Sequence, residues 1–211
     1  MGKRSNFKRR DRDFYPTPVE AVEPLIAHLP ERFTYIEPCS GDGALIKALG
    51  SFEGVAHDGN FCPLLEYASD IAPTAHTILT NPLRPLTRHE QNGHRAFIKD
   101  VFATSYEDAK NADFFITNPP WSRDVLHQLI SHLSDLRPTW LLLDSDWMHT
   151  KQATPYLRFC RKIVSVGRVK WIPDSPNTGK DNCAWYLFDQ DSVFQVPPEF
   201  WGRVAENHAL D

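Results

Sequence analysis

Short apolar runs alternate with amphipathic segments along most of the chain. Runs rich in β-branched, aromatic and leucine residues favour strands, and they occupy 33–37, 52–57, 114–117, 140–144, 163–169 and 183–188. Residues 97–102 indicate the edge of a strand followed by a turn. Apolar residues at helical spacing predict helices over 19–29, from residue 44 onward, and over 61–69, 125–136 and 151–161. Strands that alternate with helices predict an α/β fold built on a mostly parallel sheet.

The corner Asn118-Pro119-Pro120-Trp121 is the most informative stretch. Residues 114–117 favour a buried strand, which must end at the two prolines because proline cannot donate to a sheet ladder. Ligands of open α/β sheets bind outside the carboxyl ends of the strands. An amide and an indole therefore stand where we expect a ligand. Taken alone, the corner could also be a strand-ending turn with a buried tryptophan.

A glycine turn follows the strand at 33–37. Gly41 and Gly43 permit positive φ angles and a close approach of the backbone to a ligand, and a helix is predicted to begin at Ala44. A strand, a glycine turn and a helix are typical of nucleotide-binding folds, but the full G-x-G-x-x-G pattern is absent. The lone G-x-G is therefore a weak signal.

Three longer motifs resemble one family. The string Glu37-Pro-Cys-Ser-Gly-Asp-Gly43 is similar to the S-adenosylmethionine (AdoMet) motif of class I methyltransferases. The corner at 118–121 resembles the catalytic signature of amino-group methyltransferases, and Tyr15-Pro-Thr-Pro18 resembles the N-terminal cofactor motif of many adenine methyltransferases. The resemblance covers roughly residues 13–188, and its motif order is that of phage and bacterial DNA N6-adenine methyltransferases.

The resemblance implies the fold in more detail. We expect a Rossmann-like class I methyltransferase fold: a mostly parallel seven-stranded sheet with an antiparallel edge strand and helices on both faces. The last two predicted strands, 163–169 and 183–188, would pair antiparallel at the sheet edge.

The resemblance also implies AdoMet as the cofactor. Glu37 would face the positively charged amino group of AdoMet, and the segment 15–18 would meet its methionine end. Asp100, with Val101 or Phe102 packing on the ring, would hold its adenine. The implied cofactor-binding residues are Tyr15, Thr17, Glu37, Pro38, Gly41, Gly43, Asp58, Asp100, Val101, Phe102 and Asn118.

Asp58 is the candidate for binding the ribose hydroxyls. It follows the predicted strand 52–57 and lies 21 residues after Glu37, close to the spacing of about 20 at which an acid meets ribose hydroxyls in dinucleotide folds. A surface turn at 58–60 is the alternative.

The implied catalytic residues are Asn118, Pro119, Pro120 and Trp121. An amide oxygen and a proline carbonyl would accept the hydrogens of the substrate amino group, and Trp121 would stack on the base. Trp171 stands where related enzymes place an aromatic residue near a flipped base. The other substrate-binding candidates are Lys180 in the loop 171–182 and, in the basic arm, Lys8, Arg9 and Arg10.

Two other positions imitate functional motifs. Asn81-Pro82 copies the start of the corner, but leucine and arginine follow it, so it is not a catalytic corner. Cys39 follows a proline, as the nucleophile of cytosine C5 methyltransferases does, but it lies in the cofactor loop. We interpret it as a small loop residue.

The net charge of −4 conceals an asymmetry. Residues 1–13 hold six basic and two acidic side chains, so the rest of the chain carries about −8. A basic arm on an acidic body suits contact with a polyanion, because Lys and Arg neutralise phosphates whatever the sequence. A solubilising terminus is the other interpretation.

Composition limits the class of protein. No run of about 18 apolar residues predicts a membrane span, and no apolar segment follows the basic N-terminus as in a secretory signal. The four cysteines are widely spaced, which argues against a zinc site or a disulfide framework. We expect a protein of the cytoplasm, in a bacterial or phage-infected cell, without a metal.

The expected organisation is a flexible basic arm at 1–12 and one methyltransferase domain at 13–211. Only 23 residues follow Phe188, so a separate target-recognition domain is not expected. The preferred function is methylation of adenine N6 in DNA, with short or relaxed sequence recognition. The alternatives are an RNA methyltransferase acting on an adenine or guanine amino group, and an inactive nucleic-acid-binding protein of the same fold.

Overall fold

The computed structural model describes residues 15–70, 95–98, 100–172, 179–191 and 198–203. Its strands are β1 (Arg32–Glu37), β2 (Cys62–Asp70), β3 (Arg95–Ile98), β4 (Phe114–Thr117), β5 (Thr139–Asp144), β6 (Cys160–Arg168), β7 (Asn182–Phe188) and β8 (Glu199–Trp201). Its α-helices are α1 (Val19–Ile26), α2 (Ala44–Gly50), α4 (Tyr106–Ala109), α5 (Arg123–Leu136) and α6 (Thr154–Leu157). Short 3₁₀ turns are η2 (His57–Gly59), η5 (Val101–Ala103), η6 (Ser145–His149) and η7 (Lys151–Ala153).

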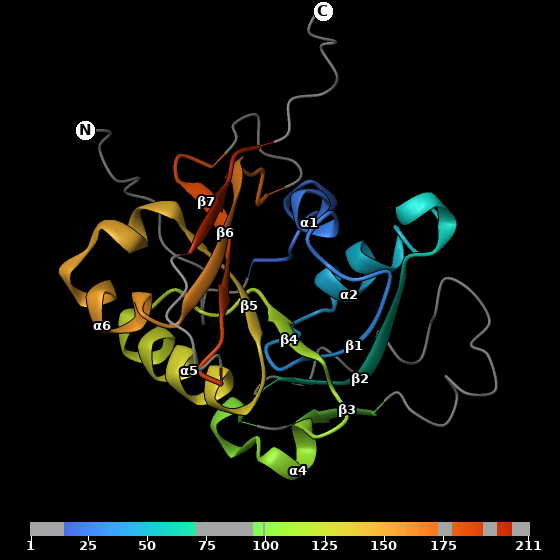
Figure 1. Ribbon diagram of the computed structural model, residues 1–211, viewed down its shortest axis with the longest axis horizontal. Coiled ribbons are helices and arrows are strands. Elements are labelled where there is room, and N and C mark those ends of the chain that lie inside the picture. The colour runs from blue at the N-terminus through green and yellow to red at the C-terminus, as the bar shows by residue number, and fades with distance from the viewer. Residues whose placement is uncertain (1–14, 71–94, 99, 173–178, 192–197, 204–211) are drawn as a thin grey trace, which may run out of the picture.

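All described strands belong to one sheet, in the order β3-β2-β1-β4-β5-β7-β6-β8 (Figure 1). The strands from β3 to β5 run parallel, and β7 runs antiparallel between β5 and β6. The predicted Rossmann-like class I fold is confirmed, including the antiparallel pairing of the last two predicted strands. The three-residue β8 extends the sheet by one more strand parallel to β6.

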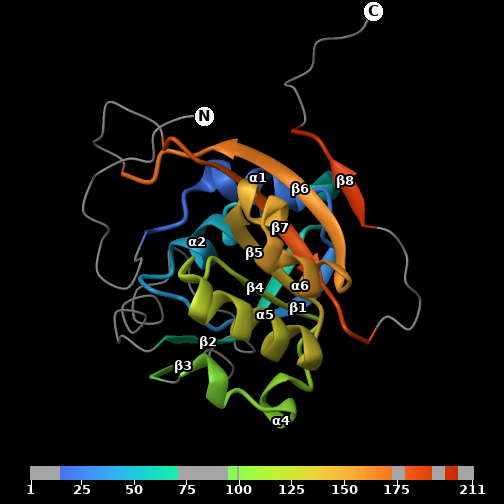
Figure 2. The ribbon, with the colours of Figure 1, turned by 90° about the vertical axis from the view of Figure 1, so that its left-hand side faces the viewer.

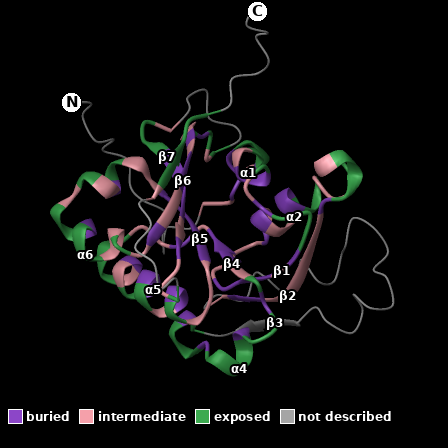
Figure 3. Ribbon diagram, viewed as in Figure 1, coloured by how far each residue is buried: buried purple, intermediate pink, exposed green. Residues whose placement is uncertain are grey.

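Helices cover both faces of the sheet because its central strands are apolar on both sides. In β5, Trp140 and Leu142 belong to one buried cluster, whereas Leu141 and Leu143 belong to another. The first cluster includes apolar residues of α1 and α2, and the second includes those of α5. Figure 2 shows these helices on opposite sides of the sheet, and Figure 3 shows that the central strands are mostly buried.

The structure corrects two of the predicted elements. Residues 52–57 are not a strand but a series of turns, in which Gly54 has a φ of 68° and its N–H donates to the carbonyl of Phe61. Residues 61–69 are not a helix, because 62–70 form β2. This strand fills the gap between β1 and β3 and pairs with both. Tertiary pairing therefore outweighs the leucine and glutamate residues that favoured a helix.

Smaller differences concern the ends of elements. The predicted helix at 151–161 is only a 3₁₀ turn and the short α6, and β6 already begins at Cys160. A threonine before a proline at the start of a helix is typical of a threonine N-cap with proline as the first helical residue. The N-cap is instead Pro18, without a side-chain cap bond. The hydroxyl of Thr17 accepts a hydrogen bond from Asn118.

Among the described residues, no helix is both long and apolar enough to cross a membrane.

A buried hydrogen bond fastens α1 to the sheet. The indole N–H of Trp185, a fully buried residue of β7, donates to the carbonyl of Ala21 in α1 at 2.7 Å. Helix α1 directly follows the segment 15–18, which reaches the corner at Asn118. This bond therefore helps to hold that segment over the sheet.

Replacing Trp185 with Phe should destabilise the fold by about 1–3 kcal/mol, because a buried carbonyl would lose its donor. Urea unfolding followed by circular dichroism measures the change. Trp201→Phe is the matched control: Trp201 is 49% exposed and its indole N–H donates to the exposed Glu199, so the change should stay within about 0.5 kcal/mol. Equal effects of the two substitutions would contradict the role of the Trp185 bond.

Candidate functional site

Polar side chains gather where the parallel strands end. Glu37 is the last residue of β1, Asp70 ends β2, and Asn118 directly follows β4. Strand β1 lies between β2 and β4, so these three positions belong to adjacent strands. The carboxyl edge of an open α/β sheet is the usual place for a ligand.

The glycine turn after β1 is built by short backbone bonds. Gly41 and Gly43 have φ angles of 52° and 75°, a region that favours glycine. The N–H of Gly43 donates to the carbonyl of Ser40 at 2.6 Å, and the N–H of Ser40 donates to the carbonyl of Ser69 at 3.0 Å. The loop is therefore attached to the end of β2 and lies at the carboxyl edge.

Glu37 is a buried acid with other acids close to it. Its side chain is 1% exposed, and its Oε2 has no hydrogen-bond partner among the described residues. Burial raises the pKa of Glu37 well above its usual value, and the neighbouring Asp70 and Asp42 raise it further. A cation bound beside these acids would relieve both effects. The site thus favours a ligand that carries a positive charge.

Sequence reasoning missed Asp70. Its Oδ2 accepts a hydrogen bond from the N–H of Gly41 at 2.7 Å, so this carboxylate joins β2 to the glycine turn. An acid at the carboxyl end of the second strand is the position in which ribose hydroxyls were expected to bind. The run Tyr67-Ala-Ser-Asp70 could have revealed it, had 62–70 been recognised as a strand.

Asp58 is not near this edge. It lies in η2, four residues before β2 begins, and is exposed. Because the sheet is parallel here, the start of β2 is at the opposite edge from Glu37 and Asp70. The turn interpretation of residues 58–60 therefore agrees with the structure. The assignment of Asp58 to the cofactor failed because the strand was placed at 52–57 instead of 62–70.

Asp100 and its neighbours follow β3, the next strand of the parallel set. The Asp100 carboxylate caps η5 by accepting the N–H of Phe102 at 3.1 Å. Val101 is buried, and Phe102 is 39% exposed. An exposed aromatic ring beside a carboxylate at the carboxyl edge is compatible with holding a purine, as the sequence predicted.

Asn118 is held by the segment that precedes α1. Its side-chain Nδ2 donates to the backbone carbonyl of Tyr15 at 3.3 Å and to the Oγ1 of Thr17 at 3.1 Å. The predicted N-terminal motif and the predicted catalytic corner are thus in direct contact. The amide N–H groups of Asn118 point toward Tyr15 and Thr17, so its oxygen is on the side away from them.

Aromatic rings stand beside this amide. Trp121 donates its indole N–H to the carbonyl of Leu142 at 3.0 Å, which fixes the ring against the end of β5. Trp171 meets it edge to face, with ring centroids 5.8 Å apart at 86°. Tyr15 contacts Trp171 at 6.4 Å. The structure therefore brings together three predicted residues from three segments, all of them half-buried.

Gly179 supports the Trp171 ring. Its N–H donates to the carbonyl of Val169 at 2.8 Å, and a Cβ at this position would lie 3.1 Å from Trp171 and only 2.8 Å from that carbonyl. Lys180, the next residue, is exposed. Lys180 thus stands next to the aromatic group, where a phosphate could reach it.

The thiol of Cys39 is not a nucleophile in this structure. Burial, with the nearby Asp70 adding to it, raises the pKa of Cys39 to about 12. A thiol reacts through its thiolate, which is scarce at neutral pH when the pKa is so high. The interpretation of Cys39 as a small loop residue agrees with this result.

The predicted substrate contacts Lys8, Arg9 and Arg10 lie outside the described residues. The look-alike Asn81-Pro82, which was not predicted to bind substrate, lies outside them too. The segment 71–94 and the middle of the loop 171–182 lie outside them as well. In the described part of the chain, no group of three or more His, Cys, Asp or Glu side chains is placed to hold a metal ion.

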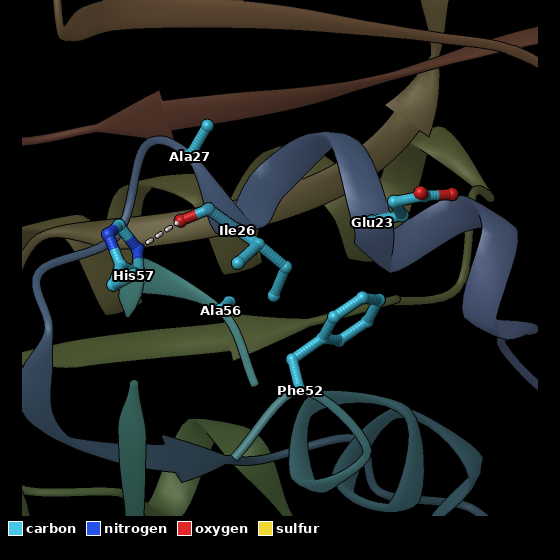
Figure 4. A pocket seen from close by; sticks show the side chains of 6 residues that line it. All are labelled: Glu23, Ile26, Ala27, Phe52, Ala56 and His57. Carbon is cyan, nitrogen blue, oxygen red and sulfur yellow. Dashed lines mark hydrogen bonds between the residues drawn. The ribbon is translucent and has the colours of Figure 1, made fainter. Parts of the chain in front are cut away.

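A separate surface pocket of about 320 Å³ lies between α1 and the turns that follow α2 (Figure 4). His57 borders it and bonds through Nε2 to the carbonyl of Ile26 at 3.0 Å. The pocket is near the amino end of β2, away from Glu37 and Asn118. Its remaining lining residues are Glu23, Ala27, Phe52 and Ala56, none of which was predicted to bind a ligand.

No protein-family model matches the chain, and no curated protein matches its sequence. Solved structures do match. A putative class I S-adenosylmethionine-dependent methyltransferase from Listeria monocytogenes matches with a TM-score of 0.54 at 12% identity, over 87% of this chain and 61% of that one. A putative RNA methyltransferase from Pyrococcus horikoshii matches with a TM-score of 0.52 at 16% identity, over 89% and 93%.

The modification subunit of a putative type I restriction enzyme from Vibrio vulnificus also matches, with a TM-score of 0.51 at 12% identity, over 92% of this chain and 48% of that one. The chain thus spans between about half and nearly all of the length of these structures. At such low identity the likeness concerns the fold. The chain has the Rossmann-like fold of class I methyltransferases.

Replacing Glu37 with Gln should stabilise the chain in the absence of any ligand. The pKa of Glu37 is raised in the folded state. The contribution of this side chain to stability is therefore complete below about pH 4.5 and is lost as the pH rises through its folded-state pKa. The gain in stability from Glu37→Gln should therefore be small near pH 5 and larger at pH 8. A gain of about 1 kcal/mol corresponds to an increase of roughly 2–4 °C in Tm.

Thermal unfolding of both proteins across this pH range measures the difference. Glu20→Gln, at an exposed position of α1, is the control and should leave Tm nearly unchanged. A gain for Glu37→Gln that does not depend on pH would show that the buried charge is not its cause.

Proposed function

We propose that this chain is an AdoMet-dependent methyltransferase that transfers a methyl group to adenine N6 in DNA, with short or relaxed sequence recognition. The observation that carries the proposal is the position of Asn118. Asn118 directly follows β4, contacts Tyr15 and Thr17, and lies beside Trp121. Strand β4 is next to β1, which ends at Glu37. Cofactor and catalytic motifs that are distant in sequence therefore meet at one edge.

The residues at this edge fit AdoMet. Glu37, with its unpartnered buried oxygen, would bind the cofactor's ammonium group, and the Gly41–Gly43 turn would let the backbone approach. Asp70 replaces Asp58 as the acid proposed for the ribose hydroxyls. Asp100, with Phe102, would hold the adenine ring. When bound, AdoMet would supply an activated methyl group on a sulfonium, so the chain need not provide a covalent nucleophile.

The corner would act by accepting hydrogen bonds. An exocyclic amino group on adenine is a poor nucleophile, because its lone pair is delocalised into the ring. The side-chain oxygen of Asn118 and the carbonyl of Pro119 would each accept one amino hydrogen, which favours a tetrahedral nitrogen with a localised lone pair. Held in this way, the nitrogen lone pair would be directed at the methyl group that bound AdoMet would supply, with the neutral thioether as the leaving group. The surplus proton leaves the nitrogen to water.

The aromatic side chains would hold the base. The face of Trp121 is the stacking surface proposed for adenine, and Trp171 is the second wall of the same site, held by its contacts with Tyr15 and Gly179. Stacking of a base on an aromatic side chain is worth ~1–3 kcal/mol. An adenine inside a duplex cannot reach the edge of this sheet, so duplex DNA would have to release it by base flipping.

DNA is preferred to RNA because the order of the motifs is that of DNA adenine methyltransferases. The solved structures with this fold include a putative RNA methyltransferase as well as a restriction-modification subunit, so the fold suits either nucleic acid. Lys180, which is exposed beside the aromatic site, and the basic residues Lys8, Arg9 and Arg10 are proposed to contact phosphates.

Incubation with radiolabelled AdoMet and unmethylated plasmid DNA should yield N6-methyladenine, identified by mass spectrometry of the released nucleosides. Asn118→Ala should lower the rate at least about a hundredfold, because it removes one acceptor of the amino group. The affinity for AdoMet, measured by calorimetry, should change little. RNA and protein substrates are tested in parallel.

Label confined to RNA or protein would overturn the proposed DNA substrate. Unchanged turnover by Asn118→Ala would remove Asn118 from the catalytic group. Absence of AdoMet binding by the wild-type chain would overturn the proposed enzyme class altogether.

Deleting residues 1–12 should weaken DNA binding and reduce its dependence on salt. This segment holds six Lys and Arg residues. Each phosphate contact contributes about 0.9 to the slope of log K against log salt, so the slope should become shallower by up to about 5. Binding titrations at several salt concentrations measure it. An unaltered slope would favour the solubilising-terminus interpretation.

A further inference from the structure

The side-chain amide of Asn118 has a defined orientation. An amide has two N–H donors on nitrogen and an acceptor oxygen on the opposite side. The nitrogen of Asn118 faces two acceptors, the carbonyl of Tyr15 at 3.3 Å and the hydroxyl of Thr17 at 3.1 Å. Both N–H groups therefore have partners, and the oxygen is turned away from the segment 15–17.

The reversed orientation would lose these bonds. The amide oxygen of Asn118 would then face the carbonyl oxygen of Tyr15, and two acceptors repel each other at this distance. The hydroxyl of Thr17 could turn and donate, but the carbonyl of Tyr15 cannot. A carboxylate at position 118 would meet the same repulsion in either orientation. The two acceptors therefore suit an asparagine whose oxygen points away from them.

Thr17 is available for this contact because it does not cap the helix. Helix α1 has Pro18 as its N-cap and no side-chain cap bond. Thr17 is only 5% exposed, and the buried bond from Trp185 to Ala21 holds the first turns of α1 to the sheet. The hydroxyl thus stands at a fixed place beside Asn118. The amide of Asn118 is part-buried, so its N–H gains from an acceptor that is already in place.

We propose that Thr17 is a positioning residue for methyl transfer, which acts by holding the amide oxygen of Asn118 toward the substrate amino group. The resemblance assigned Thr17 to the methionine end of AdoMet, which is a different role. The inference rests on the proposed function, because it concerns the same corner. If the amide turned over, it would present N–H donors to an amino group that itself donates, and the substrate nitrogen would lose its acceptor.

Thr17→Val tests this role, because valine keeps the shape of threonine and removes its oxygen. We expect kcat for methyl transfer to fall roughly 3- to 10-fold, corresponding to the loss of one hydrogen bond to a part-buried donor. The KM for AdoMet should stay within about twofold. Thr17→Ser keeps a hydroxyl at this position and should retain most of the wild-type kcat.

Thr139→Val is the matched control. Thr139 is also buried and its hydroxyl also makes a hydrogen bond, to the carbonyl of Arg137 at 2.8 Å, but it lies at the start of β5, away from the corner. This variant should keep the wild-type kcat. An equal loss of kcat in both variants would show a general loss of stability and overturn the positioning role. So would an increase in the KM for AdoMet with kcat unchanged.

The side-chain amide protons of Asn118 provide a readout that does not need activity. In ¹⁵N-correlated spectra, their signals are identified by their disappearance in Asn118→Asp. In Thr17→Val one of the two protons should shift upfield and exchange faster with water, and Thr17→Ser should reverse both changes. Unaltered signals in Thr17→Val would overturn the inference even if the wild-type chain is an active methyltransferase. A wild-type chain that methylates neither DNA nor RNA would instead overturn the proposed function, and with it the role of Thr17 in transfer.

Discussion

The parallel pairing of β1 with β4 is the constraint on which the candidate site depends. It places the ends of two strands that are distant in sequence side by side, with Glu37 on one and Asn118 just beyond the other. Both strands are buried between helices on the two faces, and interiors packed at this density do not deform easily. Glu37 and Asn118 are thereby held at one edge, where the glycine turn and the aromatic side chains join them.

A second constraint acts through α1. Threonine before a helix commonly caps it, and the cap is worth about 1 kcal/mol. In this chain the helix begins without a side-chain cap, and the hydroxyl of Thr17 contacts Asn118 instead. The buried contacts of α1, including the bond from Trp185 to Ala21, offset the missing cap. The packing of a helix on one face of the sheet thus holds a hydroxyl in place at its edge.

Much of the fold and part of the site could be predicted from local patterns. The apolar runs at 114–117 and 140–144 are short enough to favour strands over helices, and the prolines after Thr117 end the first of these strands. Strand β2 was missed because its leucines and glutamate suit a helix equally well, and only its partners β1 and β3 decide the outcome. That error moved the acid from Asp70 to Asp58. The bond from Asn118 to Thr17 joins positions 101 residues apart and leaves no local signal.

The buried acid at the end of β1 shows how the site differs from the rest of the core. A protein selected for stability alone would not keep Glu37 fully buried beside two other carboxylates, with an oxygen that has no partner in the described part of the chain. Such local violations of the folding rules are expected where a site serves a ligand. A positively charged group bound beside Glu37 would offset the burial and the neighbouring charges, which all disfavour a carboxylate. A ligand with an ammonium group would supply that charge and, by binding only the folded chain, would stabilise it in proportion to its occupancy. The cost in stability of burying Glu37 without a ligand and its proposed use in binding AdoMet therefore have the same physical origin.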